Sequence, residues 1–408
     1  MFRGAGFIIP LFLTAAAVEA QSPAQAPAAS PFSLEDALAQ ALQANPTLTA
    51  ARLRRAIDLA GIDVARERPN PELRYEQSKE TPHQSLTAAQ LIELGGKRGR
   101  RIALAEAVAR SGEAELARVV AETRSQVRHA YYAMAGVQRR IAVAEELRAL
   151  ADRARNVASA RLEVGDVSRL DLVQAEVALF QAENEATALE GELRASAAEL
   201  NTLLGRDPGV AVTVSPEIDG APFDAEAALA RALATNAALA EADRQIEEAR
   251  ARLAVARAEQ VPDPTVEGAV THDAPGEFVW GWRYAVAVAV PIFTRHRGQV
   301  RVEEATVAQL QAERTALEQR IRGFVVSAVE RASAQRRQYL RYRDAILPKA
   351  REAEAMAAES YRAGQTGLPA LLQSLQQARE LRAKAAQAAA DYQAALADLE
   401  RAAALAPQ

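Results

Sequence analysis

The chain consists of two similar halves, and this duplication constrains its fold more than any other feature. Segments of the first half recur in the second with the same order of helix formers, prolines and glycines. The matched segments are 33–45 with 224–236, 69–71 with 262–264, and 164–165 with 363–364. A repeat of roughly two hundred residues is too long for a stacked solenoid, so it indicates two equivalent halves related by pseudo-symmetry.

Residues 1–20 are expected to be a signal peptide. Arg3 precedes an apolar stretch from Ile8 to Val18, and Val18-Glu19-Ala20 offers a cleavage site. The apolar stretch is too short for a spanning helix, and an uncleaved N-terminal anchor is the alternative. Residues 21–32 are expected to form a disordered leader, and its part from Gln21 to Pro31, rich in alanine, proline, serine and glutamine, is expected to pack against nothing.

The composition excludes several classes of site. The chain has no cysteine, which removes disulfides, thiolate metal sites and a lipid-anchoring cysteine. Its 49 basic and 53 acidic residues are interleaved along the sequence, so nucleic acid is not an expected partner. The four histidines, His83, His129, His272 and His296, have no spacing that puts two on one helix face, and no metal site or cofactor is predicted. No nucleophile elbow or HExxH motif occurs, so no enzyme is predicted.

Each half is expected to contain a short helix, a second helix, two strands and a long helical hairpin. Alanine, glutamate, arginine and leucine dominate without proline from about Gly99 to Pro208, and a glycine turn interrupts this run. The first arm of that hairpin, about 65 residues long, would extend close to ~100 Å. The predicted divisions are a first repeat at 33–205 with strands at about 72–94 and a hairpin at about 99–205, a linker at 206–223, and a second repeat at 224–405 with strands at about 264–292 and a hairpin at about 298–405. Pro348 is expected to kink or divide the outgoing helix of the second hairpin.

One segment has the alternation of a membrane β-strand. The lipid-facing positions predicted for it are Phe278, Trp280, Trp282, Tyr284, Val286, Val288 and Val290, and the positions between them are mostly small. The alternative is an amphipathic strand on a soluble core. Four strands per chain cannot close a barrel, and an open edge cannot face hydrocarbon, so a membrane role requires several chains in one barrel.

At this point the sequence resembles the TolC-like outer-membrane efflux proteins. The resemblance rests on the duplicated element order, on residues 161–172, which read RLEVGDVSRLDL, and on their counterpart 361–368, YRAGQTGL. It implies a mainly α fold in which long helical hairpins form a periplasmic tunnel and three chains contribute four strands each to one twelve-stranded membrane β-barrel. Residues 93–98, ELGGKR, resemble the strand-to-helix junction of the CzcC-like branch, which works with heavy-metal resistance-nodulation-division (RND) pumps.

The resemblance also implies roles for particular residues. Periplasmic adaptor proteins dock at the hairpin tips, which here are Arg161, Val164, Gly165, Asp166, Val167, Ser168, Tyr361, Gly364, Gln365, Thr366, Gly367 and Leu368. Family members close the tunnel with acidic residues after the second tip, where this chain has Ala370 and Gln373. Asp171, after the first tip, keeps a carboxylate, so Asp171 and Gln373 are the candidate gate positions.

The predicted function is therefore an outer-membrane exit duct of a Gram-negative tripartite efflux system, with a long periplasmic extension, exporting divalent heavy-metal cations. Its implied partners are two further copies of the chain, a periplasmic adaptor (membrane fusion) protein, an inner-membrane RND pump and outer-membrane lipid. Two alternatives remain open from the sequence: a multidrug or type I secretion channel, and a periplasmic coiled-coil scaffold without a pore.

Overall fold

The structure, a computed structural model, describes residues 31–215 and 225–403. The predicted signal peptide and all but the last two residues of the predicted leader lie outside the described residues. The first half comprises α1 (Leu34–Ala44), α2 (Pro46–Arg66), β1 (Glu72–Gln77), β2 (Gln84–Leu91), α3 (Lys97–Glu163) and α4 (Arg169–Leu203). The second half comprises α5 (Ala225–Thr235), α6 (Ala237–Ala258), β3 (Pro264–Ala274), β4 (Phe278–Val288), α7 (Arg297–Arg341), a π-helix η1 (Tyr342–Ile346), α8 (Leu347–Arg362) and α9 (Leu368–Ala403).

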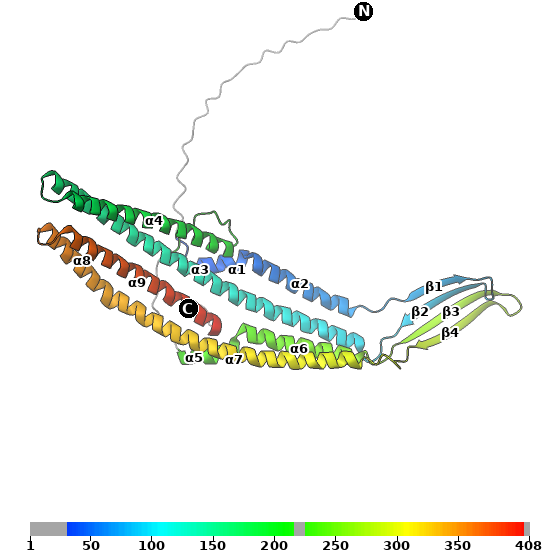
Figure 1. Cartoon of the computed structure of the whole chain (residues 1–408). Helices are drawn as coiled ribbons and strands as arrows, with labels where there is room; N and C mark the ends of the chain where they lie inside the picture. The colour runs from blue at the N-terminus through cyan, green and yellow to red at the C-terminus, as the bar shows by residue number, and fades with distance from the viewer. Residues whose placement is uncertain (1–30, 216–224, 404–408) are drawn as a thin grey trace, which may run out of the picture.

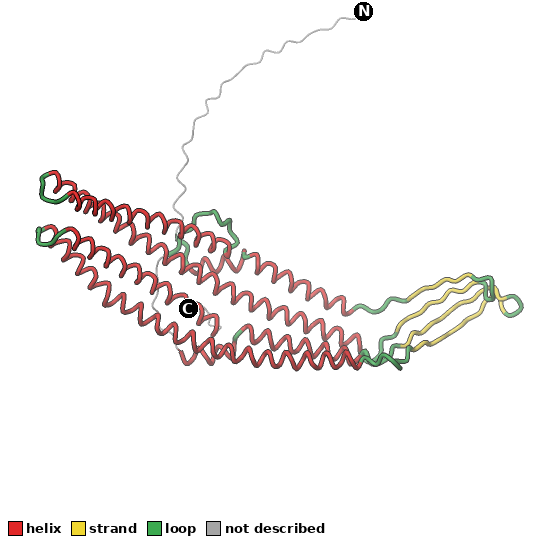
Figure 2. Tube along the Cα trace, in the orientation of Figure 1, coloured by secondary structure: helices red, strands yellow, loops and turns green. Residues whose placement is uncertain are grey.

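The molecule is elongated, with the sheet at one end and both hairpin turns at the other (Figures 1 and 2). The 67-residue helix α3 runs through most of the helical body and packs against α2, α4, α6 and α9. Its alanine-rich interior faces let neighbouring helices lie close together. The sheet and the hairpin turns therefore lie far apart and are joined by continuous helices.

The two halves begin their second helices in the same way. Asn45 accepts hydrogen bonds from the backbone amides of Thr47 and Leu48, and Asn236 does the same with Ala238 and Leu239. An asparagine at this position satisfies amides that have no partner inside the helix. The repeated sequence thus produces the same local structure twice.

Each half also has an equivalent apolar core beside its short first helix. In the first half, α1 packs on α3 and α4 around Leu38, Met134 and Leu200. In the second, α5 packs on α7 and α9 around Val325 and Leu399. These cores lie in the middle of the helical body and attach each hairpin to the short first helix of its half.

The prediction of a disordered leader at 21–32 is wrong at Phe32. Its amide donates to the Thr213 carbonyl at 2.8 Å, and its carbonyl accepts from Ser215 at 3.1 Å and from the Tyr131 hydroxyl at 2.9 Å. Phe32 also packs on the core around α1, where its aromatic ring buries apolar surface. The first part of the linker is therefore fixed to the chain immediately before α1.

Pro348 divides the outgoing helix of the second hairpin without changing its course. The chain forms the π-helix η1 immediately before α8, which begins at Leu347 with Pro348 in its first turn. Proline has no amide proton and its ring displaces the carbonyl one turn earlier, so the backbone widens locally. Helices α7 and α8 still follow one curved path (Figure 1).

The four strands form one antiparallel sheet in the order β1-β2-β3-β4. Two predicted strand ends are too long: β2 ends at Leu91 instead of Leu94, and β4 ends at Val288 instead of Val290. Both β2 and β4 pair with β3, and β3 begins at Pro264. The last pairs at this end of the sheet are therefore Leu91 with Thr265 and Pro264 with Val288. The first hairpin correspondingly starts at Lys97, two residues before its predicted start. Among the described residues, none of the helices is long and apolar enough to cross a membrane.

Candidate functional site

The strand registers divide the sheet into two faces of opposite character. Pairing places one set of side chains on what we call the apolar face: Leu73, Tyr75, Leu86, Ala88, Val266, Val270, Trp280, Trp282, Tyr284, Val286 and Val288. The opposite set forms the polar face: Glu72, Arg74, Glu76, Ser85, Thr87, Glu267, Thr271 and Arg283. Glutamines and His272 enter the apolar face only close to the strand ends. The alternation seen in one strand of the sequence thus extends across all four.

Burial on the two faces is the reverse of that in a soluble protein. Ser85 and Thr87 on the polar face are each 8 % exposed, whereas Leu86 between them is 52 % exposed. Trp282 and Tyr284 on the apolar face are 72 % and 81 % exposed. An extended exposed apolar surface indicates contact with lipid or with another protein, and strands that are apolar outside and polar inside are typical of membrane barrels.

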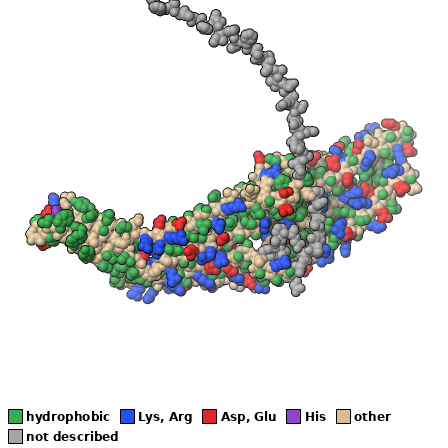
Figure 3. Space-filling model, turned by 180° about the vertical axis from the view of Figure 1, so that it is seen from behind, with side chains coloured by type: hydrophobic (Ala, Val, Ile, Leu, Met, Phe, Trp, Pro, Cys, Tyr) green, Lys and Arg blue, Asp and Glu red, His purple; other side chains and the backbone are tan. Residues whose placement is uncertain are grey.

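Phe278 departs from the predicted alternation. A Cβ placed on Gly281 would lie 2.6 Å from the Phe278 ring and 2.7 Å from the Thr271 hydroxyl, so the ring lies over Gly281 on the polar face. Asp273, in the strand opposite, has a positive φ of 60°, and the β3 and β4 pairing skips this residue. The ladder is irregular at this end, and Phe278 does not join Trp280 and Trp282. On the visible side of Figure 3, hydrophobic side chains gather at the sheet end while charged ones follow the helices.

The strand-to-helix junction joins the two halves through an ion pair. Lys97 Nζ lies 2.6 Å from one carboxylate oxygen of Asp263, and the Leu94 amide donates to the other at 2.9 Å. Desolvation raises the pKa of Asp263, but the hydrogen bonds from Lys97 and from the Leu94 backbone outweigh it, so the pKa lies below its usual value. Gly95 and Gly96 have φ of 67° and 71° and turn the chain sharply at this point. The ELGGKR motif therefore fixes the sheet to the helical body.

The two hairpin turns have the same backbone geometry. Gly165 and Gly364 have φ of 77° and 73°, and each follows the C-cap residue of its helix, Val164 or Ala363. The amides after them donate back to the last helical turn, Asp166 to the Arg161 carbonyl at 2.8 Å and Gln365 to the Ser360 carbonyl at 2.9 Å. This pair of features is the Schellman arrangement that ends many helices. Val164, Gly165, Asp166 and Ser168, and Gly364 to Gly367, are exposed, while Val167 is half-buried.

A contact between the hairpins lies just behind the turns. The Arg161 guanidinium stacks over the Tyr361 ring at 4.9 Å, and Tyr361 itself is buried between α3, α8 and α9. Such a cation–π contact is worth about 0.5–2 kcal/mol, depending on desolvation. Arg161 and Tyr361 therefore hold the two hairpins together and do not project into solvent like the turn residues.

The predicted gate positions differ in their surroundings. The Asp171 carboxylate accepts from the Ser168 amide at 2.9 Å and its hydroxyl at 2.7 Å, forming a capping box at the start of α4. These bonds, the hydroxyl first, lower the pKa of Asp171 and keep it ionised. Gln373 is exposed on α9. The Asp171 carboxylate thus already has a structural role.

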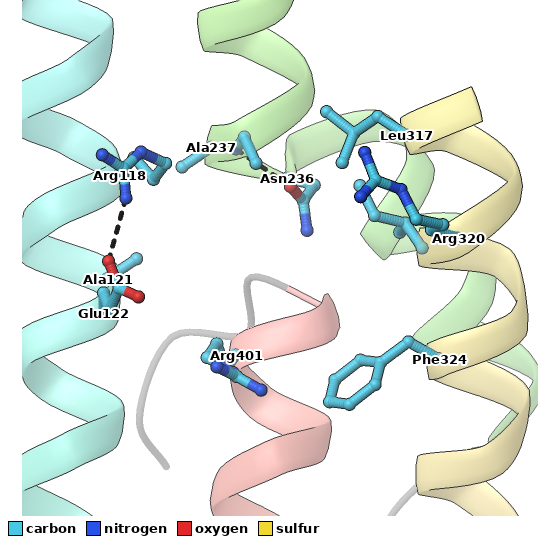
Figure 4. Close-up of a pocket in the computed structure, with 11 residues that line it drawn as sticks. Arg118, Ala121, Glu122, Asn236, Ala237, Leu317, Arg320, Phe324 and Arg401 are labelled. Carbon is cyan, nitrogen blue, oxygen red and sulfur yellow. Dashed lines mark hydrogen bonds and ion pairs between the residues drawn. The ribbon is translucent and has the colours of Figure 1, made fainter. Parts of the chain in front are cut away.

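A groove of about 710 Å³ lies in the helical body between α3, α6, α7 and α9 (Figure 4). Arg118, Arg320 and Arg401 surround it, and Leu317 and Phe324 form its apolar wall. Its one lining carboxylate, Glu122, pairs with Arg118 at 2.9 Å. Guanidinium groups repel metal cations, so this groove is not a metal site. Nor do the described residues contain any group of three or more histidine, cysteine or acidic side chains placed to hold a metal.

Sequence reasoning missed the Lys97–Asp263 pair, the Arg161–Tyr361 stack and the arginine-lined groove. Each joins helices or strands from different halves of the chain, and spacing along one segment carries no signal for such contacts. Only Asp263 could have been singled out from the sequence, because the repeat aligns it with Asn70 of the PNP motif and the two matched positions differ in charge.

Comparison with known proteins places these features in a family. Residues 37–206 match the outer membrane efflux protein family. The cobalt-zinc-cadmium resistance protein CzcC of Cupriavidus metallidurans is 30 % identical over 349 residues, covering 83 % of this chain and 81 % of that protein. Two solved structures share the fold. A membrane protein from Pseudomonas aeruginosa has a TM-score of 0.77, 18 % identity and coverage of 91 % of this chain and 93 % of that one. The outer membrane protein VceC of Vibrio cholerae has a TM-score of 0.74, 16 % identity and coverage of 91 % and 95 %.

The helical body, the sheet with an exposed apolar face and these relatives define the class as an outer-membrane efflux channel. The alternative of a periplasmic coiled-coil scaffold without a pore is thereby set aside. The chain belongs to the outer membrane efflux protein family, in its CzcC-like branch. This is a family of channels and not of enzymes.

Proposed function

We propose that this chain is the outer-membrane exit duct of a tripartite system that removes divalent heavy-metal cations from the cell. Three copies would close one barrel, with the apolar face toward lipid and the polar face lining the lumen. The observation that carries this proposal is the reversed burial of the sheet, where Leu86 is exposed between the buried Ser85 and Thr87. The helical body would continue the lumen into the periplasm, and an energised inner-membrane pump would drive transport.

The choice of metal cations is supported by the relative named for cobalt, zinc and cadmium resistance. The polar face places Glu72, Glu76 and Glu267 along the proposed lumen, together with Arg74 and Arg283, and Arg74 lies 2.9 Å from Glu72. Hard and borderline divalent cations interact favourably with carboxylate oxygens. Weak, exposed contacts of this kind suit passage better than retention.

The hairpin turns are the proposed docking surface for a periplasmic adaptor protein. They are exposed, share one backbone geometry and lie at the end opposite the sheet. Asp171 and Gln373 remain the proposed gate positions behind the turns.

Deletion of the gene tests the proposed cargo. Tolerance to zinc, cobalt or cadmium should fall, while tolerance to antibiotics and detergents stays close to that of the parent strain. Re-expression of the chain should restore metal tolerance. Loss of antibiotic tolerance with unchanged metal tolerance would instead favour a multidrug channel, and loss of an exported protein would favour a type I secretion channel.

A further inference from the structure

The sheet ends in two strands without partners among the described residues. β1 pairs only with β2, and β4 pairs only with β3. Unpaired strand edges are costly in hydrocarbon, because their amides and carbonyls find no water there. The following inference rests on the proposed barrel, in which β4 of one copy meets β1 of the next.

The internal repeat determines the register of this missing pair. The hairpins β1–β2 and β3–β4 are equivalent, so the β2–β3 pairing inside the chain is equivalent to the β4–β1 pairing between copies. The PNP and PDP motifs align Glu72 with Thr265 and therefore Glu76 with Ala269. The hairpin registers then align Ser85 with Arg283, Thr87 with Ala285 and Ala89 with Ala287.

Applying the β2–β3 register to the equivalent strands determines the register between β4 of one copy and β1 of the next. Inside the chain, Thr87 lies opposite Ala269, and Ala89 lies opposite Glu267. We propose that β4 pairs with β1 of a second copy in the register that places Ala285 opposite Glu76 of that copy, so that Arg283 forms an ion pair with this glutamate inside the lumen.

Side-chain size and face agree with this register. On the polar face it places alanines opposite the long side chains of Arg74 and Glu76, as β2 places Thr87 and Ser85 opposite them within the chain. On the apolar face it places Val286 opposite Tyr75, an aromatic and β-branched pair of the kind that stabilises sheets. A slip by one residue would turn every side chain of the strand to the wrong face.

Charge supports the same pairing. Arg283 makes no ion pair with any residue that the structure describes. Glu76 is 58 % exposed in its side chain, and its nearest cation, Arg74 Nη1, is 4.0 Å away. In the proposed register Arg283 is diagonal to Glu76, at roughly 7–8 Å between backbones, which long side chains span. The second copy thus supplies a carboxylate for Arg283 and a second cation beside Glu76.

Disulfide scanning tests the register, since the chain contains no cysteine. The full-length double variant Tyr75→Cys with Val286→Cys should give covalent dimers and trimers after oxidation in outer membranes, because directly opposite residues have disulfide geometry. The matched controls pair Tyr75→Cys with Tyr284→Cys or with Val288→Cys, each displaced by two residues. Both controls should cross-link far less.

The outcomes separate the register from the proposed function. Stronger cross-linking of either control, or no cross-linking of any pair in a protein that forms outer-membrane trimers, overturns the register alone. A protein that is absent from outer membranes overturns the barrel itself.

A double-mutant cycle tests the ion pair. Arg283→Gln and Glu76→Gln should each lower the fraction of trimer that survives detergent challenge several-fold, and the double variant should lower it no further. If instead the loss of trimer in the double variant is the product of the two single losses, the two side chains act independently, and the pairing of Arg283 with Glu76 is overturned.

Discussion

A cation placed on the apolar face should prevent assembly, while the same cation on the neighbouring residue should not. Val286 and Ala287 are adjacent in β4 and lie on the apolar and polar faces respectively. Val286 is 68 % exposed in the single chain, so an arginine there would meet hydrocarbon and not a packed interior. Val286→Arg and Ala287→Arg therefore differ in the solvent that receives the charge.

The free-energy cost of the arginine depends on how deep residue 286 lies in the membrane. Val286 is three residues from Arg283, the middle residue of β4, or ~7 Å along the membrane normal for a strand tilted by ~45°. An arginine on the lipid face costs about 2–4 kcal/mol at the midplane and less toward the interface, so about 2 kcal/mol per chain is expected. Three copies would then lose about 6 kcal/mol, a shift of roughly 10⁴ in the assembly equilibrium.

Quantitative immunoblotting of outer-membrane fractions after equal expression measures the effect. Val286→Arg should leave little detergent-resistant trimer, and Ala287→Arg should assemble close to the parent level with altered conductance. Equal yields of the two variants would refute the assignment of the faces.

The remaining predictions concern the turns and the junction. Gly165→Val or Gly364→Val should cost about 1–2 kcal/mol locally, because both residues have positive φ, and should reduce adaptor cross-linking and metal efflux together while the trimer persists. Unchanged cross-linking in both variants would exclude the turns as the docking surface. Asp263→Asn should lower stability by about 1–3 kcal/mol near pH 7, since it leaves the largely buried Lys97 without its anion. The pKa of Asp263 is lowered in the folded chain, so its stabilisation is complete above the unfolded value of ~3.9 and is lost as the pH falls through the folded value. Melting curves should therefore separate parent and variant at pH 7 and converge in acid, whereas a constant separation down to pH 2 would contradict the ion pair.

The sequence predicts the repeated local structure well because each signal lies within one segment. Asn45 and Asn236 begin matched helices, Gly165 and Gly364 end matched helices, and alternation in β4 identifies the residues that this strand contributes to the apolar face. These features depend on backbone preferences and periodicity, which neighbouring residues determine. The resemblance then supplies the arrangement of several copies, which no periodicity contains.

Contacts between segments could not be predicted in the same way. Lys97 and Asp263 come from different halves, and only the fold brings them together. Phe278 follows the period of its strand, yet the irregular pairing at Asp273 turns its ring to the other face. Pro348 indicated a break, but the proline alone did not tell whether the helix would bend or form the π-helix η1 and keep its course.

Passage of metal cations through this lumen is tested most directly by the rate of zinc efflux from preloaded cells that carry the pump, the adaptor and Ala285→Cys. The rate is measured before and after treatment with a bulky, membrane-impermeant maleimide. Ala285 lies on the polar face beside Val286 on the apolar face, and the parent chain has no other thiol. Ala285→Cys should be labelled and its zinc efflux should slow, while Val286→Cys should resist labelling and keep its rate of efflux. Undiminished zinc efflux through fully labelled Ala285→Cys would contradict the claim that metal cations leave through this lumen.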